Sequence, residues 1–332
     1  MLTKRENLIE TIRGGKPDRF VKQFEFVRDL CSDPWNATTT MPQYPGDKDQ
    51  TGAWGVTWSW PAGTPGPFPV HDQGKKVLED VTEWEKIVKH PPLEYPDELW
   101  QAAAEDYAKY DRKEFFVGPV MFPGLFECTH CLMGMENAMI SFYEEPEAMH
   151  DMINSFVDWE TAYVKQMADI LHPDAVIHHD DWGSQRSTFF SPDMFDEFFL
   201  EPYKRLYGFY RSHGFELIIH HSDSYAATLV PEMIEIGVDI WQGGTKSNDL
   251  PSVLKQYGGR ISIMSGIDSS IVDKENWTAE EVKQCVDEAC SSMGPLYFIP
   301  CQTQGDSAST FDGVYDAINE EIDRMSARIF RA

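Results

Sequence analysis

The sequence contains no long apolar segment and comparatively little positive charge. No apolar run approaches the roughly 20 residues that a bilayer-spanning helix needs. The stretch from Met1 to Asn7 is polar and has no apolar core of the kind that defines a secretory signal. The 332 residues include 28 lysines and arginines against 55 aspartates and glutamates, which gives a formal net charge of −27. Such a surface repels nucleic acid and anionic membranes, so we expect neither as a partner.

Cysteine is also scarce, and a cofactor-binding glycine motif is missing. The six cysteines are scattered along the chain and do not form the dense framework of a small secreted domain. We therefore expect a cytoplasmic protein with reduced thiols. Cys128, His130 and Cys131 suggest a metal site, but they lead into an apolar segment, which favours buried structural thiols. No Gly-x-Gly-x-x-Gly or Walker-type loop follows a predicted strand, so a nucleotide-binding sheet has little support.

The chain does contain a regular alternation of strands and helices. A capped helix is predicted from Thr3 to Arg13, and a strand from Phe20 to Phe26. From Glu114 onward, six strand-then-helix units follow one another, and polar residues gather where the strands end. This pattern predicts a (β/α)8 TIM barrel over residues 1–332, with its site at the C-terminal ends of the strands. A doubly wound open sheet is the alternative.

Residues 33–92 interrupt this alternation. Prolines, glycines and aromatic residues crowd together there, which predicts a long irregular insertion that serves as a lid or a binding surface. Packing of the insertion onto the barrel is the simplest role for its tryptophans. The functional alternative is an aromatic pocket, and for that role we select Trp58, Trp60 and Phe68 as substrate-binding residues.

The apolar strand from Leu217 to Ile219 ends in His220, His221, Ser222 and Asp223. Because side chains alternate along a strand, His221 and Asp223 point the same way. An imidazole and a carboxylate so placed form either a pair of metal ligands or an acid/base pair. A histidine that is simply hydrogen-bonded to its neighbouring aspartate is the alternative.

Other strand ends add polar residues to the same predicted mouth. His221, Asp223 and Cys301 would supply three zinc ligands and leave one position open for substrate. Asp181 and Glu25 are the candidate catalytic residues, although the sequence does not decide whether Asp180 or Asp181 faces the site. A polar barrel mouth without metal is the alternative.

Several motifs make the chain resemble the uroporphyrinogen decarboxylase superfamily over nearly its whole length. They are Thr3-Lys-Arg-Glu, Pro17-Asp-Arg, Asp180-Asp-Trp-Gly-Ser-Gln, Ser191-Pro-Asp-Met-Phe, and His221-Ser-Asp followed by Pro231-Glu-Met-Ile-Glu-Ile-Gly-Val-Asp. The resemblance implies a (β/α)8 barrel that forms a homodimer. The decarboxylases of the superfamily use no metal and hold a polyanionic porphyrinogen with arginines at the first strand, where this chain has Phe20-Val-Lys-Gln-Phe-Glu-Phe.

The corrinoid-dependent methyltransferases of the same superfamily provide the better match. They bind zinc through a His-x-Cys pair and a later cysteine, positions that correspond to His221, Asp223 and Cys301, with Asp223 replacing the first cysteine. The resemblance thus implies a zinc-dependent methyltransferase of the O-demethylase type, which moves a methyl group from a small methylated substrate to a corrinoid protein. A methoxylated aromatic compound is our first choice of substrate. The alternatives are a metal-free decarboxylase and a non-catalytic ligand-binding barrel.

Overall fold

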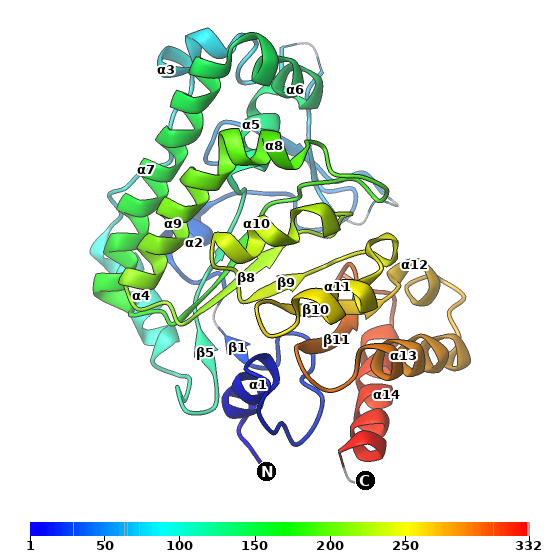
Figure 1. Ribbon diagram of the computed structural model, residues 1–332. Helices are drawn as coiled ribbons and strands as arrows, with labels where there is room; N and C mark the ends of the chain where they lie inside the picture. Colours follow the sequence, from blue (N-terminus) through cyan, green and yellow to red (C-terminus); the bar gives the residue numbers. More distant parts are fainter. Residues whose placement is uncertain (29, 63, 65, 73, 308, 331–332) are drawn as a thin grey trace.

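The structure is a computed structural model that describes residues 1–28, 30–62, 64, 66–72, 74–307 and 309–330. Its centre is built from parallel strands (Figure 1). β1 (Val27–Arg28) pairs with β5 (Phe116–Val117), and six more strands pair in the order β11-β10-β9-β8-β7-β6. The bounds of these six are β6 Val120–Met121, β7 Ala175–His179, β8 Leu217–His221, β9 Ile240–Gln242, β10 Ser262–Ile267 and β11 Phe298–Gln302. Only two residues separate β5 from β6, so one sheet continues into the other.

The strands enclose a single apolar interior. Val27 of β1 and Ile299 of β11, which belong to the first and last of these strands in the chain, lie in the same buried cluster as residues from β5, β7, β8, β9 and β10. A cluster shared by the first and last strands is what a barrel interior produces, because alternate side chains of every strand point inward. The predicted TIM-barrel fold is confirmed.

Helices cover the outside of the strands (Figure 1). In the first half of the chain they are α4 Asp97–Tyr107, α5 Leu125–Met133, α6 Met135–Glu144 and α7 Pro146–Leu171, whereas α1 (Lys4–Ile12) packs its Leu8 into the interior cluster. In the second half they are α8 Pro192–Phe195, α9 Glu201–Ser212, α10 Val230–Glu235, α11 Leu250–Tyr257, α12 Ser269–Val272, α13 Ala279–Met293 and α14 Val314–Ile329. None of these described helices combines the length and the apolar character that crossing a bilayer requires.

The two predictions for the N-terminal segment had different outcomes. The predicted first helix is present, with the Thr3 side chain accepting from the Glu6 N–H and the Glu6 carboxylate accepting from the Thr3 N–H. The predicted strand from Phe20 to Phe26 is wrong, because residues 23–26 form turns and Phe24 has a φ of 51°. A positive φ is incompatible with an extended strand, so the strand begins only at Val27.

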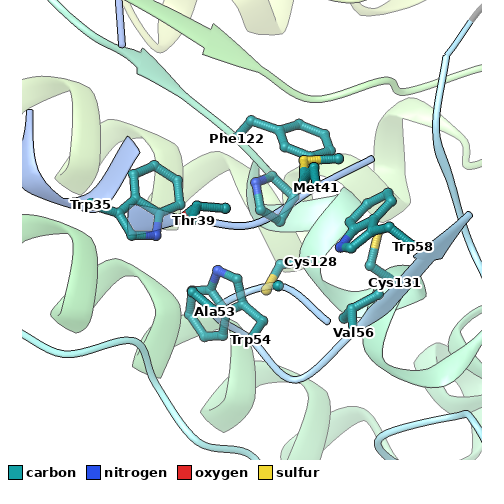
Figure 2. A pocket seen from close by; sticks show the side chains of 12 residues that line it. Trp35, Thr39, Met41, Ala53, Trp54, Val56, Trp58, Phe122, Cys128 and Cys131 are labelled. Atoms are coloured by element: carbon teal, nitrogen blue, oxygen red, sulfur yellow. The ribbon is translucent and has the colours of Figure 1, made fainter. Parts of the chain in front are cut away.

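The insertion is more regular than the sequence suggested. It contains α2 (Pro34–Thr38), α3 (Trp84–Ile87) and an antiparallel sheet of β2 Gln50–Thr51, β3 Thr57–Ser59 and β4 Phe68–Pro69. A tight turn joins β2 to β3: Gly55 adopts a φ of 81° and donates to the carbonyl of Gly52. Trp54 and Trp58 are buried against the barrel's outer layer (Figure 2). The insertion therefore covers part of the body.

Candidate metal centre at the barrel mouth

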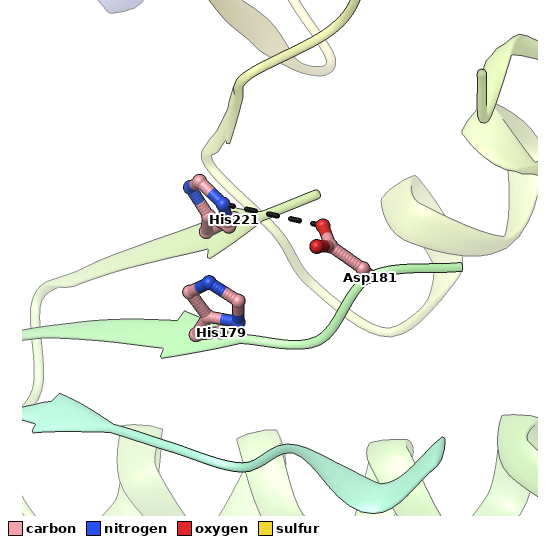
Figure 3. A group of neighbouring side chains, drawn as sticks. All are labelled: His179, Asp181 and His221. Carbon is pink, nitrogen blue, oxygen red and sulfur yellow. Dashed lines mark ion pairs between the residues drawn. The ribbon is translucent and has the colours of Figure 1, made fainter. Parts of the chain in front are cut away.

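Two histidines stand side by side at the C-terminal ends of β7 and β8. Leu217 and Ile219 belong to the barrel interior and Ile218 to the outer layer, so His221 continues the inward-facing set. His179 occupies the equivalent position on β7 and is in register with His221. Their rings stack with centroids 4.1 Å apart and planes inclined by 22° (Figure 3). The parallel register therefore places two imidazoles at the mouth.

Asp181 completes a group of three potential metal ligands. It follows β7, and its Oδ1 lies 4.0 Å from His221 Nε2 and accepts the Asp223 N–H at 2.8 Å. The ligand atoms of His179, Asp181 and His221 all lie within 4.8 Å of one another (Figure 3). Two imidazoles and a carboxylate are the ligand set of several catalytic zinc sites, which keep a further position open. The group therefore fits zinc.

Each histidine is held by a neighbour through Nδ1. Glu127 Oε2 lies 2.8 Å from His179 Nδ1, and Gln242 Oε1 makes the corresponding contact with His221 Nδ1. These acceptors favour the tautomer that carries the proton on Nδ1, which leaves Nε2 free to bind a metal. Burial raises the pKa of Glu127 well above its ordinary value, and the nearby Asp181 and Asp180 add to that effect.

The adjacent Asp180 has a different role. Its carboxylate is fully buried and accepts hydrogen bonds from the Phe126 N–H at 3.0 Å, the Glu127 N–H at 2.7 Å, the Trp182 indole at 2.9 Å and the Tyr203 hydroxyl. Two of these donors are backbone groups in the first turn of α5, which have no partner within the helix. Asp180 therefore anchors α5, while Asp181 faces the site.

The histidines that precede the inward pair point outward. His178 and His220 are completely buried between the strands and the helices. His178 Nε2 lies 3.2 Å from a carboxylate oxygen of Glu160, and the Tyr207 hydroxyl lies 2.8 Å from His220 Nδ1. Each strand thus ends with one histidine in the wall and one at the mouth.

Asp223 lies beside the group, and its ionisation is perturbed. Burial, followed by repulsion from Asp181, raises its pKa from 3.8 to about 7. Burial and the neighbouring His179 lower the pKa of His221. Because several ionisable groups share this small space, a bound cation would relieve the repulsion between the carboxylates.

This perturbation predicts a pH-dependent stability in chelator-treated protein. The folded state holds the Asp223 proton more tightly than the unfolded state does, so this group lowers the free energy of unfolding as the pH rises from about 4 through 7. Asp223→Asn should remove the penalty and stabilise the metal-free protein at pH 8 by ~1–2 kcal/mol, a value discounted because the side chain is partly exposed. Urea denaturation at pH 5 and pH 8 checks this. The prediction is contradicted if the difference in free energy of unfolding between Asp223→Asn and the unmodified protein is no larger at pH 8 than at pH 5.

Of the three ligands predicted from the sequence, only His221 belongs to the close group. Asp223 is its neighbour, as described above. Cys301 points into the barrel from β11 and is 1% exposed. Burial raises its pKa, and a hydrogen bond with the side chain of Gln242 opposes that rise. Gln242 thus lies between His221 and Cys301, and the assignment of Asp223 and Cys301 as ligands stays a prediction.

The remaining predicted site residues lie in several places. Glu25 is partly buried and accepts the Lys22 N–H at 3.1 Å. Trp60 donates its indole N–H to the Thr64 carbonyl at 3.0 Å, and Phe68 is 49% exposed. Trp58, in contrast, is buried and lines a small apolar pocket.

Sequence reasoning missed His179, Glu127 and Gln242. A signal for His179 was present, because β7 and β8 both end in a His-His doublet. Parallel strands of the same pattern place equivalent residues side by side. Glu127 had no such signal, because the helix that carries it was not predicted.

Comparison with known proteins bears on the family and the fold. The uroporphyrinogen decarboxylase (URO-D) family profile matches residues 116–296. A methyltransferase from Methanosarcina mazei has a similar structure, with a TM-score of 0.64 and 12% identity over 98% of this chain and 99% of that chain. An endo-β-1,4-xylanase from Gloeophyllum trabeum is less similar, with a TM-score of 0.40 and 10% identity over 69% of this chain and 81% of that one. No curated protein sequence matches.

The matched segment is more than half of the chain and includes β5 to β10, and with them His179, Asp181 and His221. The full-length likeness to the Methanosarcina mazei methyltransferase supports the same barrel fold. The chain therefore belongs to the uroporphyrinogen decarboxylase family.

Proposed function

We propose that the protein is a zinc-dependent methyltransferase that moves a methyl group from a small methoxylated aromatic compound to a corrinoid carried by a partner protein. The observation that carries the proposal is the convergence of His179, Asp181 and His221 at the barrel mouth. The full-length structural likeness to a methyltransferase is consistent with it. The TIM-barrel mouth is also where enzymes of this fold place their reactive groups.

Two groups of residues would have different roles in the proposed reaction. His179, Asp181 and His221 would hold the metal, while Glu127 and Gln242 keep the two imidazoles oriented. Zinc, when bound, supplies Lewis acidity that stabilises negative charge on the leaving oxygen. In the reaction the methyl–oxygen bond breaks with its electron pair staying on oxygen, and the methyl carbon bonds to the reduced cobalt of the partner. We therefore propose this ligand set alongside the one predicted from sequence.

The decarboxylase alternative is less well supported by the first strand. Arg28 of β1 donates to the carbonyls of Phe24 at 3.2 Å and Val27 at 2.7 Å, and its guanidinium lies over the Phe115 ring at 4.3 Å. Because the Arg28 guanidinium already makes these contacts, it is poorly placed to bind a substrate carboxylate. The net charge of −27 also disfavours a polyanionic porphyrinogen. We expect the purified protein not to convert uroporphyrinogen.

Spectroscopy of the corrinoid tests the proposed function. Mixing the protein with a reduced corrinoid protein from the same organism and a methoxylated aromatic compound should produce the absorption spectrum of methyl-cobalt. His221→Ala should slow this change by at least ~100-fold, because a metal ligand is lost. Asp268→Asn is a suitable control, since Asp268 caps α12 and accepts the Ser270 N–H at 3.0 Å.

The outcome also ranks the alternatives. If no ether, alcohol or amine in a broad panel of methyl donors alkylates the corrinoid, the methyltransferase proposal is wrong and the non-catalytic ligand-binding barrel becomes the better explanation. Turnover of uroporphyrinogen without added metal would favour the decarboxylase instead.

A further inference from the structure

A cavity lies at the end of the barrel opposite the candidate metal centre, between α1 and the points where several strands begin (Figure 1). Its volume of about 200 Å³ is far above the ~10–15 Å³ that one water molecule needs. It is smaller than the roughly 300–1,000 Å³ pockets of drug-sized ligands, so it suits a smaller molecule. Leu217, which lines the cavity, begins β8, whereas His221 ends it, so the length of this strand separates the cavity from the metal centre.

Part of the cavity wall is apolar. Phe116 and Leu217 belong to the buried interior cluster of the barrel, and the side chains of α1 in the lining pack against that cluster. The apolar lining residues, called the floor below, are Ile9, Ile12, Phe116, Leu217 and Ile261. The floor can therefore remove an apolar group of a ligand from water.

The two carboxylates of the lining already have cationic partners. Glu216 Oε2 lies 2.8 Å from a guanidinium nitrogen of Arg5. Asp239 Oδ2 lies 2.5 Å from a guanidinium nitrogen of Arg211 and accepts the Ile218 N–H at 2.7 Å. Neither Arg5 nor Arg211 belongs to the lining. The charges of both carboxylates are thus balanced from outside the cavity.

The two arginines of the lining, in contrast, have no carboxylate partner. Arg13 follows α1 and Arg260 precedes β10, and both are exposed. Within the described part of the chain, neither side chain makes a hydrogen bond or an ion pair, although the Arg260 guanidinium lies 5.1 Å from the Tyr257 ring centroid. The chain contains 55 aspartates and glutamates against 28 lysines and arginines, so two unpaired guanidiniums beside one cavity are unexpected. They are available to bind an anion.

The ring of Tyr297 joins the two turns that carry these arginines. Gly14 follows Arg13, and a Cβ atom added to it would lie 2.0 Å from the Tyr297 hydroxyl oxygen. Gly259 precedes Arg260, and a Cβ atom added there would lie 3.5 Å from the same oxygen. Both turns therefore pack against one ring and present like charges to one small space. A bound anion would relieve the repulsion between these charges.

We infer that this cavity is a binding site for a small organic carboxylate, with the carboxylate group held by Arg13 and Arg260 and the apolar body lying on the floor. The planar fork of a guanidinium matches both oxygens of a carboxylate. A polyanion is disfavoured, because Glu216 and Asp239 also border the cavity. The site is separate from the metal centre, and its ligand does not depend on the proposed function.

Isothermal titration calorimetry with benzoate tests the inference. The full-length protein is first freed of metal with a chelator, so that benzoate cannot bind to zinc at the barrel mouth. Benzamide and benzamidine have nearly the shape of benzoate but are neutral and cationic. Benzoate should bind saturably, benzamide at least roughly tenfold more weakly because charge-assisted hydrogen bonds are lost, and benzamidine not at all. Absence of saturable benzoate binding, or equal affinities for benzoate and benzamide, would overturn the inference.

Acetate tests the contribution of the floor. It carries the same charge as benzoate but has almost no apolar surface to bury, so it should bind at least roughly tenfold more weakly. An equal affinity for acetate and benzoate would show that the floor does not contact the ligand.

Three arginines provide matched variants. Arg13→Gln and Arg260→Gln should each weaken benzoate binding at least roughly tenfold, because each removes a charged hydrogen-bond donor. Arg205→Gln makes the same change in net charge on α9, outside the lining, where Arg205 pairs with Asp158 at 3.1 Å. It should change benzoate binding less than about twofold, since exposed charges at a distance are screened by salt. Equal losses in all three variants would reduce the effect to net charge and reject the site.

A second measurement needs no variant. Phenylglyoxal modifies exposed guanidiniums, and peptide mass spectrometry measures the rate at each arginine. At a benzoate concentration about tenfold above its Kd, only about a tenth of the sites stay free, so modification of Arg13 and Arg260 should slow at least roughly fivefold. Arg186, which is exposed on the loop after β7, should react at an unchanged rate. Equal rates with and without benzoate at Arg13 and Arg260 would exclude them as ligand-binding residues.

Discussion

His179→Ala should lower the zinc content of the purified protein from about one ion per chain to less than roughly a tenth of that, because a three-ligand site has no ligand to spare. His221→Ala should do the same. Cys301→Ala distinguishes the two ligand sets. If zinc is held by His179, Asp181 and His221, this variant should keep its metal, whereas the set predicted from the sequence requires its loss. Elemental analysis after dialysis against a weak chelator measures all three.

A smaller loss of zinc affinity is expected when the changed residue contacts a metal ligand but not the metal itself. Glu127→Gln keeps the shape of the side chain but replaces the carboxyl group beside His179 Nδ1 with an amide. Changes of this kind weaken metal binding by about 10–100-fold. A competition titration should therefore detect a lower zinc affinity, whereas the zinc content after dialysis should stay close to that of the unmodified protein. Full zinc occupancy in His179→Ala would exclude His179 as a ligand.

Asp180→Ala should destabilise the protein by about 3–5 kcal/mol, because a fully buried carboxylate with several hydrogen-bond donors around it is removed. The indole of Trp182, the hydroxyl of Tyr203 and two N–H groups of α5 lose an acceptor. The free energy of unfolding, measured by urea denaturation of chelator-treated protein, checks the value.

The neighbouring Asp181 provides the matched control. Its side chain is 28% exposed, so Asp181→Ala in the metal-free protein should change the free energy of unfolding by less than about 1 kcal/mol. In the presence of zinc, however, Asp181→Ala should lose the stabilisation that bound metal provides, since Asp181 belongs to the ligand group. Equal destabilisation of the two metal-free variants would show that the assignment of roles to the two aspartates is wrong.

The sequence predicted the features that depend on local pattern. The apolar run from Leu217 to Ile219 predicted the strand, alternation predicted that His221 and Asp223 share a face, and the βα succession from Glu114 onward predicted the barrel. The strand expected at Phe20 to Phe26 failed because an apolar run does not reveal a residue in a left-handed conformation such as Phe24. Local pattern determines which residues are buried more reliably than it determines backbone geometry.

The site itself required information that a single segment does not contain. His179 and His221 become neighbours through the register of β7 and β8, which is a pairing between segments 42 residues apart (179 and 221). Asp180 and Asp181 have the same chemistry in the sequence, and only the position of α5 assigns one to the wall and the other to the mouth. Since α5 was not predicted, its Glu127 could not be placed either.

The outward histidines of β7 and β8 have a consequence for how the metal would be acquired. Glu160 and Tyr207 hold His178 and His220 from the helical side of the wall, so a slip of either strand by one residue would separate a buried polar pair. The alignment of the inward histidines is therefore supported from outside the barrel. Under the proposed function, zinc would enter a site whose two imidazoles the wall already holds in place.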